Sequence, residues 1–185
     1  MSISLFFTMI SISKYTTYLK DNLTVITGTA DFVCPVCSYN DYEIHGTCHR
    51  KVQSAEGTKQ FRLRVLRCTR CGKTHRELPA GIVPYKRLCA ESLVEIAEAD
   101  PFAQTEALND DDFLDYEIST WRRIRRWLSW FLQYAQFIAE GLRSEGLQIP
   151  TEAPGKTLSE QLVYFVRLVV NSGNWQQHRS VLCVH

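Results

Sequence analysis

Hydrophobic and polar residues alternate between positions 60 and 66 of the chain. The apolar positions are Phe61, Leu63 and Val65, and the polar positions between them are Arg62 and Arg64. A period of two is typical of a β-strand with one buried face, because successive side chains point to opposite sides of a sheet. The pattern predicts a half-buried strand with both arginines on its solvent face. Residues 43–52 are expected to pair with it as a hairpin, closed by a turn at residues 55–57.

Farther along, apolar residues recur at intervals of three and four, which is the spacing of an amphipathic helix. Residues 87–99 are predicted to form a first helix, and residues 121–138 a longer one. The buried stripe of the longer helix consists of Trp121, Ile124, Leu128, Phe131, Ala135 and Ile138. Ser119 or Thr120 is expected to cap the start of this helix, and Gly141 is expected to stop it.

A capping box marks the start of a last helix. Thr157 is followed three residues later by Glu160, so that each side chain can satisfy a backbone N–H of the first turn. This helix is expected to end within residues 171–174. Residues 1–12 are apolar, but they lack a basic stretch and a cleavage site and are too few to cross a bilayer. We therefore expect a strand there, rather than a signal peptide or a membrane span.

Two Cys-x-x-Cys pairs lie on either side of the predicted hairpin: Cys34 with Cys37, and Cys68 with Cys71. A turn of this kind supplies two thiolates from one bend, and two such turns complete the tetrahedral shell of a structural zinc ion. Gly72 directly follows the second pair, where a positive φ is often required and glycine adopts it most easily. The spacing therefore predicts a zinc site with four cysteine ligands.

The alternatives are a redox dithiol, a disulfide framework, and a site in which another side chain replaces one cysteine. A redox Cys-x-x-Cys normally opens a helix, whereas Ser38, which stands in the place of the knuckle glycine, begins a turn-forming stretch. The thirty residues between the pairs exceed the roughly 15–20 of compact sites. The possible substitutes are His45, Cys48, His49 and His75. We interpret them as exposed or packed hairpin residues, because four thiolates already satisfy the metal.

Length and composition set the frame for these features. With 185 residues, of which 45% are hydrophobic, the chain can form one core-bearing domain or two small ones. The cysteine count of seven is odd, and more than half of the cysteines have metal-like spacing, which indicates a reducing compartment. We expect the protein to be cytoplasmic.

Charge is distributed unevenly although the net charge is only +1. Basic residues dominate positions 50–87: Arg50, Lys51, Lys59, Arg62, Arg64, Arg67, Arg70, Lys73, Arg76, Lys86 and Arg87. Positions 91–117 carry acidic residues without any lysine or arginine. Positive charge then returns with Arg122, Arg123, Arg125 and Arg126. Clustered basic residues indicate a polyanionic partner. The alternative is that they pair with the acidic segment of the same molecule.

Residues 68–79 read Cys-Thr-Arg-Cys-Gly-Lys-Thr-His-Arg-Glu-Leu-Pro and lead to Ile-Val-Pro-Tyr at residues 82–85. This stretch resembles an uncharacterised bacterial zinc-ribbon family (domain of unknown function 6431). It is also similar to the N-terminal zinc-ribbon and helix-turn-helix part of insertion-sequence transposases. The resemblance covers roughly residues 30–135 and includes His45-Gly46, Ser119-Thr120 and Arg126-Trp127.

The resemblance implies double-stranded DNA as a partner. The residues implied near the start of the long helix, which would reach base edges or flanking phosphates, are Arg122, Arg123, Arg125 and Arg126. The residues implied on the ribbon, which would contact phosphates, are Arg62, Arg64, Arg67, Arg70 and Lys73. Trp121, Trp127 and Trp130 could stack on the bases of a single strand, but their helical spacing favours core packing for at least two of them.

We therefore expect an α+β fold in which an N-terminal zinc ribbon, a small antiparallel sheet, is followed by an all-α helix-turn-helix-like bundle. The expected division is residues 1–86 for the N-terminal strand and ribbon, residues 87–148 for the helix-turn-helix-like region, and residues 149–185 for a linker, a C-terminal helix and a tail.

The expected function is that of a zinc-stapled DNA-binding protein, related to mobile elements and lacking a catalytic domain. Acidic residues crowd into positions 110–115 instead of the separated positions of a two-metal nuclease, so no enzymatic activity is expected unless the chain is a fragment of a transposase. The alternative function is a zinc-stabilised adaptor that binds a protein partner or a second copy. No membrane and no small-molecule substrate are expected.

Overall fold

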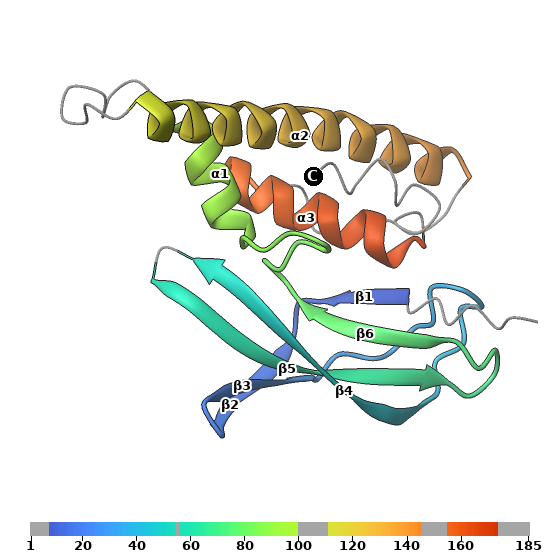
Figure 1. Cartoon of the computed structure of the whole chain (residues 1–185). Helices are drawn as coiled ribbons and strands as arrows, with labels where there is room; N and C mark the ends of the chain where they lie inside the picture. Colours follow the sequence, from blue (N-terminus) through green and yellow to red (C-terminus); the bar gives the residue numbers. More distant parts are fainter. Residues whose placement is uncertain (1–7, 55, 100–110, 146–154, 174–185) are drawn as a thin grey trace, which may run out of the picture.

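The computed structural model describes residues 8–54, 56–99, 111–145 and 155–173, with side chains described from residue 118 onward in the third of these segments. These residues form six strands and three helices (Figure 1). The strands are β1 (Thr8–Ile12), β2 (Tyr15–Lys20), β3 (Leu23–Gly28), β4 (Tyr42–Ser54), β5 (Gly57–Cys68) and β6 (Thr74–Pro79). The helices are α1 (Ala90–Glu98), α2 (Asp111–Ser144) and α3 (Leu158–Asn171).

All six strands belong to one mixed sheet in which β5 is central. β4 runs antiparallel to β5 along one edge. The other edge of β5 is shared, because β3 runs parallel to residues 61–63 and β6 runs antiparallel to residues 65–67. β1 is added in parallel to β6, and β2 is added antiparallel to β3. The sheet therefore forks beside residue 64. It is curled and occupies one side of the molecule, with the helices on the other (Figure 1).

The expected fold, a small antiparallel ribbon followed by an all-α helix-turn-helix-like bundle, is wrong. The predicted hairpin of β4 and β5 is present, but the remaining four strands extend it into the larger mixed sheet. Two of the added pairings, β1 with β6 and β3 with β5, are parallel. Parallel neighbours are joined by long connections rather than by a local turn, so no short-range pattern in the sequence identifies them.

Sequence reasoning also missed the hairpin of β2 and β3, for which the chain does contain a signal. Its two-residue turn consists of Asp21 and Asn22, which both have a positive φ, of 54° and 59°. Two-residue hairpin turns favour such residues because their backbone twist matches that of the flanking strands. The Asp-Asn pair between two β-rich stretches could have identified this hairpin.

The helices pack on one side of the sheet instead of forming a separate bundle: α1 and α3 lie next to the strands, and α2 packs on α1 and α3 farther from them (Figure 1). All three contact one another, and α3 lies against β1. Asn171, at the end of α3, fixes this contact: its Oδ1 accepts a hydrogen bond from the backbone N–H of Ser11 at 2.8 Å, and its Nδ2 donates to the Ser11 carbonyl at 3.0 Å. One hydrophobic cluster joins the sheet and the helices, with Ile26, Leu63, Leu66, Leu78, Phe131 and Leu162 among its buried members.

The capping box at the start of α3 is confirmed. The Thr157 hydroxyl accepts a hydrogen bond from the backbone N–H of Glu160 at 3.2 Å, and the Glu160 carboxylate accepts one from the backbone N–H of Thr157 at 3.0 Å. The helix ends at Asn171 as expected, and Gly173 beyond it has a φ of +77°. Local hydrogen bonding therefore determines both ends of α3.

The predicted ends of the long helix are wrong. α2 spans Asp111–Ser144, so Ser119 and Thr120 lie inside the helix rather than at its cap, and Gly141 does not stop it. A glycine within a helix costs only about 1 kcal/mol relative to alanine, which the packing of one buried face offsets. That face includes Ile124, Leu128, Phe131 and Ala135 as predicted. Within the described segments, no helix has both the length and the apolar character that crossing a membrane requires.

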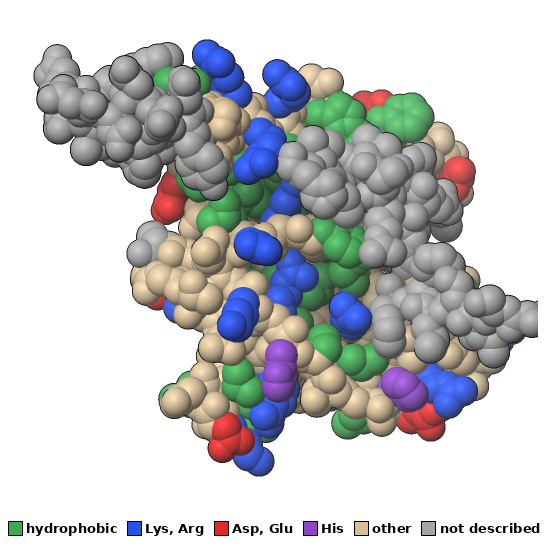
Figure 2. All heavy atoms as spheres, in the orientation of Figure 1, with side chains coloured by type: hydrophobic (Ala, Val, Ile, Leu, Met, Phe, Trp, Pro, Cys, Tyr) green, Lys and Arg blue, Asp and Glu red, His purple; other side chains and the backbone are tan. Residues whose placement is uncertain are grey.

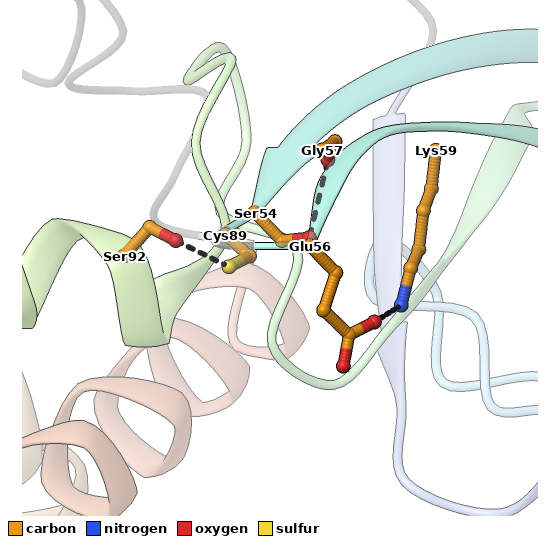
Figure 3. A network of polar contacts seen from close by, with 6 residues as sticks. All are labelled: Ser54, Glu56, Gly57, Lys59, Cys89 and Ser92. Atoms are coloured by element: carbon orange, nitrogen blue, oxygen red, sulfur yellow. Dashed lines mark hydrogen bonds and ion pairs between the residues drawn. The ribbon is translucent and has the colours of Figure 1, made fainter.

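The tip of the β4–β5 hairpin is tied to the start of α1. The backbone N–H of Gln53 donates to the Arg87 carbonyl at 2.7 Å, and the N–H of Cys89 donates to the Gln53 carbonyl at 3.1 Å. Side-chain contacts at this corner join Ser54 with Gly57, Glu56 with Lys59, and Cys89 with Ser92 (Figure 3). The hairpin is therefore anchored to the helices and is not a free arm.

Candidate metal centre and basic face

Two backbone turns of the same geometry carry the four cysteines of the Cys-x-x-Cys pairs. In each turn the first cysteine donates its N–H to the carbonyl five residues ahead, and its own carbonyl accepts the N–H four residues ahead. The distances from the backbone nitrogen to the carbonyl oxygen are 2.8 Å from Cys34 to Tyr39, 2.8 Å from Ser38 to Cys34, 2.9 Å from Cys68 to Lys73 and 3.0 Å from Gly72 to Cys68. Ser38 and Gly72 both have a left-handed φ, of 57° and 68°. Serine thus occupies the knuckle position that glycine fills in the second turn.

The four sulfur atoms lie together. All four Sγ atoms are within 4.8 Å of one another, and the Cys34–Cys71 and Cys37–Cys68 distances are both 3.6 Å. A tetrahedral site with metal–sulfur bonds of ~2.3 Å needs sulfur–sulfur distances of ~3.8 Å. None of the described cysteines forms a disulfide. The predicted ligands are therefore brought together, and the cluster can hold a metal ion.

The thiols of the cluster differ in acidity. Burial raises the pKa of Cys34 to about 12, and burial also raises the pKa of Cys71. Burial acts in the same direction on Cys68, but the backbone N–H groups of Cys71 and Arg70 stabilise its thiolate and lower its pKa to about 7. A cation between the sulfurs favours the thiolate form of all four. Metal binding therefore displaces protons from this cluster.

The long stretch of chain between the two Cys-x-x-Cys pairs forms the β4–β5 hairpin. Tyr42, at the start of β4, is paired with Cys68 at the end of β5. The backbone N–H and the hydroxyl of Thr69 both lie 3.3 Å from the Asp41 carbonyl. The chain thus leaves the first turn, runs out along β4, and returns along β5 to place the second turn beside the first.

One of the four possible substitute ligands lies beside the cluster. His75, on β6, is fully buried, and its Nε2 is 3.4 Å from the Sγ of Cys34. Burial lowers the pKa of His75 to about 4. On β4, His45 and His49 are exposed and Cys48 is half-buried. The four cysteines form a complete set of ligands without the histidine.

Arg64 does not lie on the solvent face, contrary to the sequence pattern. Its Nε lies 2.6 Å from Oε2 of Glu77, and the two side chains are only 15% and 5% exposed. The Arg64 Nη2 also donates to the Gly28 carbonyl at 2.9 Å. The guanidinium occupies the fork where β3 and β6 share one edge of β5.

The other basic residues predicted on the ribbon lie nearer the surface. Arg67, Arg70 and Lys73 are exposed around the second cysteine turn, and Arg62 is partly exposed in the middle of β5. The Nη1 of Arg67 lies 3.4 Å from Oε1 of Glu43, and the Nε of Arg62 lies 3.4 Å from Nε2 of His49. The guanidinium carbon of Arg70 lies 5.8 Å from the centre of the Tyr39 ring.

The four clustered arginines of α2, at positions 122, 123, 125 and 126, are all exposed. Arg125 lies over the indole ring of Trp121, with its guanidinium carbon 5.1 Å from the ring centre. An open groove of about 310 Å³ is lined by Trp121, Arg122, Arg125, Arg126 and Ser129. Within the part of the chain that the structure describes, no acidic side chain forms an ion pair with these arginines.

A lysine from the loop before α1 also reaches α2. The Lys86 Nζ lies 4.4 Å from the centre of the Trp127 ring. Its loop is held by Arg50, whose Nη2 donates to the carbonyls of Val83 and Lys86 at 2.7 and 2.8 Å. Figure 2 shows lysine and arginine side chains in a broken column from the helices to the sheet. We call Lys86 and the four arginines at positions 122–126 the basic face.

Comparison with known proteins gives one match. No curated protein and no solved structure matches the chain. Residues 34–127, just over half of the 185 residues, match a family described as a domain of unknown function (DUF6431). The matched segment begins at the first cysteine of the cluster and ends within α2, so it includes both cysteine turns and the four arginines at positions 122–126. The chain belongs to this family.

Proposed function

We propose that this protein is a zinc-stabilised DNA-binding protein that contacts the phosphates of double-stranded DNA through the basic face. The observation that carries the proposal is the cluster of four exposed arginines on α2, with no acidic ion-pair partner among the described residues. A relation to mobile elements is supported by the resemblance of residues 68–85 and is part of this proposal.

The arrangement of the basic face suits a polyanion. Arg122, Arg125 and Arg126 share one groove on α2, where several guanidinium groups can meet neighbouring phosphates. Arginine presents planar donors that match phosphate oxygens, and it is less strongly hydrated than lysine. Lys86 lies 4.4 Å from the centre of the Trp127 ring on the same helix, which brings a further positive charge to α2. Phosphate contacts of this kind position a duplex without reading its sequence.

Zinc is the ion that the donor set favours. Thiolate ligands select zinc, copper(I) or iron over the oxygen-preferring magnesium and calcium, and a closed tetrahedral set of four cysteines is typical of structural zinc. The bound ion would supply folding free energy rather than chemistry, since four protein ligands leave no open position. It would fix the two cysteine turns to each other and thereby hold one end of the β4–β5 hairpin.

The test measures binding to a labelled random duplex by fluorescence anisotropy over a series of salt concentrations. For zinc-loaded protein we expect dissociation constants of ~10⁻⁴–10⁻⁶ M that weaken as salt rises, because neutralising phosphates releases counterions. Changing Arg122, Arg123, Arg125 and Arg126 together to Gln should flatten the slope of log affinity against log salt. The expected change is about 0.9 for each phosphate that the variant no longer neutralises.

A matched pair of single variants lies on the same helix. Arg126→Gln should reduce the slope, whereas Arg143→Gln, in the exposed last turn of α2, should leave it unchanged. Equal slopes for the wild type and the quadruple variant would overturn the proposal, as would absence of binding at low salt. The zinc-stabilised protein adaptor would then be the function to test.

A further inference from the structure

A buried histidine connects the cysteine cluster to the N-terminal strand. His75 is fully buried, and its two ring nitrogens face different partners. Nε2 lies 3.4 Å from the Sγ of Cys34. Nδ1 is hydrogen-bonded to the hydroxyl of Thr8, which also lies 3.0 Å from the Thr74 carbonyl. Thr8 stands opposite His75 in the parallel pairing of β1 with β6.

We infer that His75 is a positioning residue of the metal centre, which donates a hydrogen bond from Nε2–H to the metal-bound thiolate of Cys34 while Thr8 orients its ring. This inference depends on the metal centre of the proposed function but not on DNA binding. It assigns a role to a residue outside the four ligands, and it makes β1 part of the support of the site.

The charge of the loaded site explains why such a donor is needed. Four thiolates around a divalent ion carry a net charge of −2, and Cys34 is fully buried, so water cannot solvate its sulfur. An N–H donor to an ionised acceptor is stronger than one between neutral groups. Backbone N–H groups of Val36 and Cys37 also stabilise the Cys34 thiolate. His75 supplies the side-chain donor from β6, and the ring of Phe32 packs against it with the two ring centres 5.7 Å apart.

The Thr8 hydroxyl can form a hydrogen bond with either neutral tautomer of the ring. A hydroxyl has a single proton to donate, and two acceptors are in reach. When Thr8 donates to the Thr74 carbonyl, its oxygen accepts from Nδ1–H, and Nε2 can accept the S–H of an unloaded Cys34. When Thr8 donates to Nδ1 instead, the neutral ring carries its proton on Nε2 and can donate to the thiolate. A change of tautomer, with no change in ring charge, thus suits the ring to each state of the cluster.

The test compares metal affinity and cobalt spectra in three variants. His75→Leu removes the donor, His75→Gln places an amide N–H at similar reach, and Thr8→Val removes the orienting hydroxyl without changing the size of the side chain. Affinities for Zn²⁺ and Co²⁺ are measured by chelator competition, and the sulfur-to-cobalt charge-transfer band is recorded. We expect His75→Leu to bind ~10–100-fold more weakly with a shifted band, His75→Gln to recover most of both, and Thr8→Val to fall between wild type and His75→Leu.

Each outcome decides the inference. Wild-type affinity and an unshifted band in His75→Leu would overturn it. If His75→Leu does not fold, Thr8→Val, which retains the buried imidazole, decides the case: unchanged affinity and an unchanged band would overturn the inference, and a weakened, shifted site would support it. A wild-type protein that binds neither metal would instead contradict the metal centre itself, which separates that failure from this one.

Discussion

The guanidinium of Arg64 and the carboxylate of Glu77 meet at two points, with 2.6 Å between Nε and Oε2 and 2.7 Å between Nη2 and Oε1. The hydrogen bond to Glu77 raises the pKa of Arg64. The pair joins β5 to β6 almost without solvent, and β6 carries the buried His75 toward the cysteine cluster. This ion pair therefore links the centre of the sheet to the candidate metal centre.

Removing one member of the pair should be strongly destabilising. Glu77→Ala leaves a buried guanidinium without its counter-ion, and we expect the free energy of unfolding of the metal-loaded protein to fall by about 3–5 kcal/mol. Urea unfolding followed by circular dichroism measures the change. Replacing both partners, as Arg64→Met with Glu77→Leu, should cost much less because no charge remains buried. A decrease below about 0.5 kcal/mol in Glu77→Ala, the range of neutral surface substitutions, would contradict the buried pair.

A methyl group at Gly28 should disturb the same ion pair. A Cβ at this position would lie 2.5 Å from the Glu77 Oε1 and 3.3 Å from the Arg64 Nη2. Gly28→Ala should therefore lower the free energy of unfolding by about 1–3 kcal/mol, as overpacking typically does. In a double-mutant cycle with Glu77→Ala, the two decreases should not add, because the second change removes the atom that the first one displaces. Strictly additive decreases would show that Gly28→Ala acts elsewhere.

Two small substitutions in the cysteine turns are expected to change the stability of the protein in opposite directions. Gly72→Ala places a side chain at a φ of +68°, and Ser38→Gly relieves one at +57°. The left-handed conformation costs a residue with a Cβ about 1–2 kcal/mol. We expect Gly72→Ala to destabilise the metal-loaded protein by about this amount, and Ser38→Gly to stabilise it by up to about 1 kcal/mol, because the greater flexibility of glycine in the unfolded chain offsets part of the relief. Thermal unfolding of both variants with zinc bound measures the two changes in stability. Changes of the same sign in both variants would contradict the prediction.

Metal affinity should depend on pH in a definite direction. The pKa of Cys34 is about 12, and that of Cys71 is also raised by burial, so these thiols are protonated in the unloaded protein at neutral pH. The apparent affinity should therefore rise as the pH rises. For each thiol proton that metal binding displaces, the increase should be about tenfold per pH unit at pH values below the pKa of that thiol. Competition titrations at two pH values on either side of neutrality measure the slope.

Two cysteine variants serve as controls for that titration. Cys71→Ser removes a ligand and should abolish tight binding together with the tetrahedral four-thiolate cobalt spectrum. Cys48→Ser, in the middle of β4 and outside the cluster, should leave both unchanged. An affinity that is independent of pH, or that survives Cys71→Ser, would show that metal binds elsewhere on the chain.

The sequence by itself determined the features that are local in the chain. The β4–β5 hairpin follows from its alternation and its turn, the capping box of α3 from Thr157 and Glu160, and the ligand set from the two cysteine pairs. Each of these depends on residues that are close in sequence or on a spacing that the chemistry of the ion requires. Such signals are readable because the hydrogen bonds of a cap or turn, and the two thiols of each cysteine pair, lie within a few residues of one another.

The tertiary structure alone decided which distant segments meet. The parallel pairings of β1 with β6 and of β3 with β5 bring together strands whose side-chain patterns specify a face but not a neighbour. The alternation of residues 60–66 predicts a solvent-facing Arg64. Because of these pairings, Arg64 lies instead in the fork between two strands, where it donates hydrogen bonds to the Glu77 carboxylate and the Gly28 carbonyl. His75 likewise lies beside the cysteine cluster because β6 pairs with β5, which sets His75 opposite Leu66, and the pairing of β1 with β6 brings Thr8 to its ring.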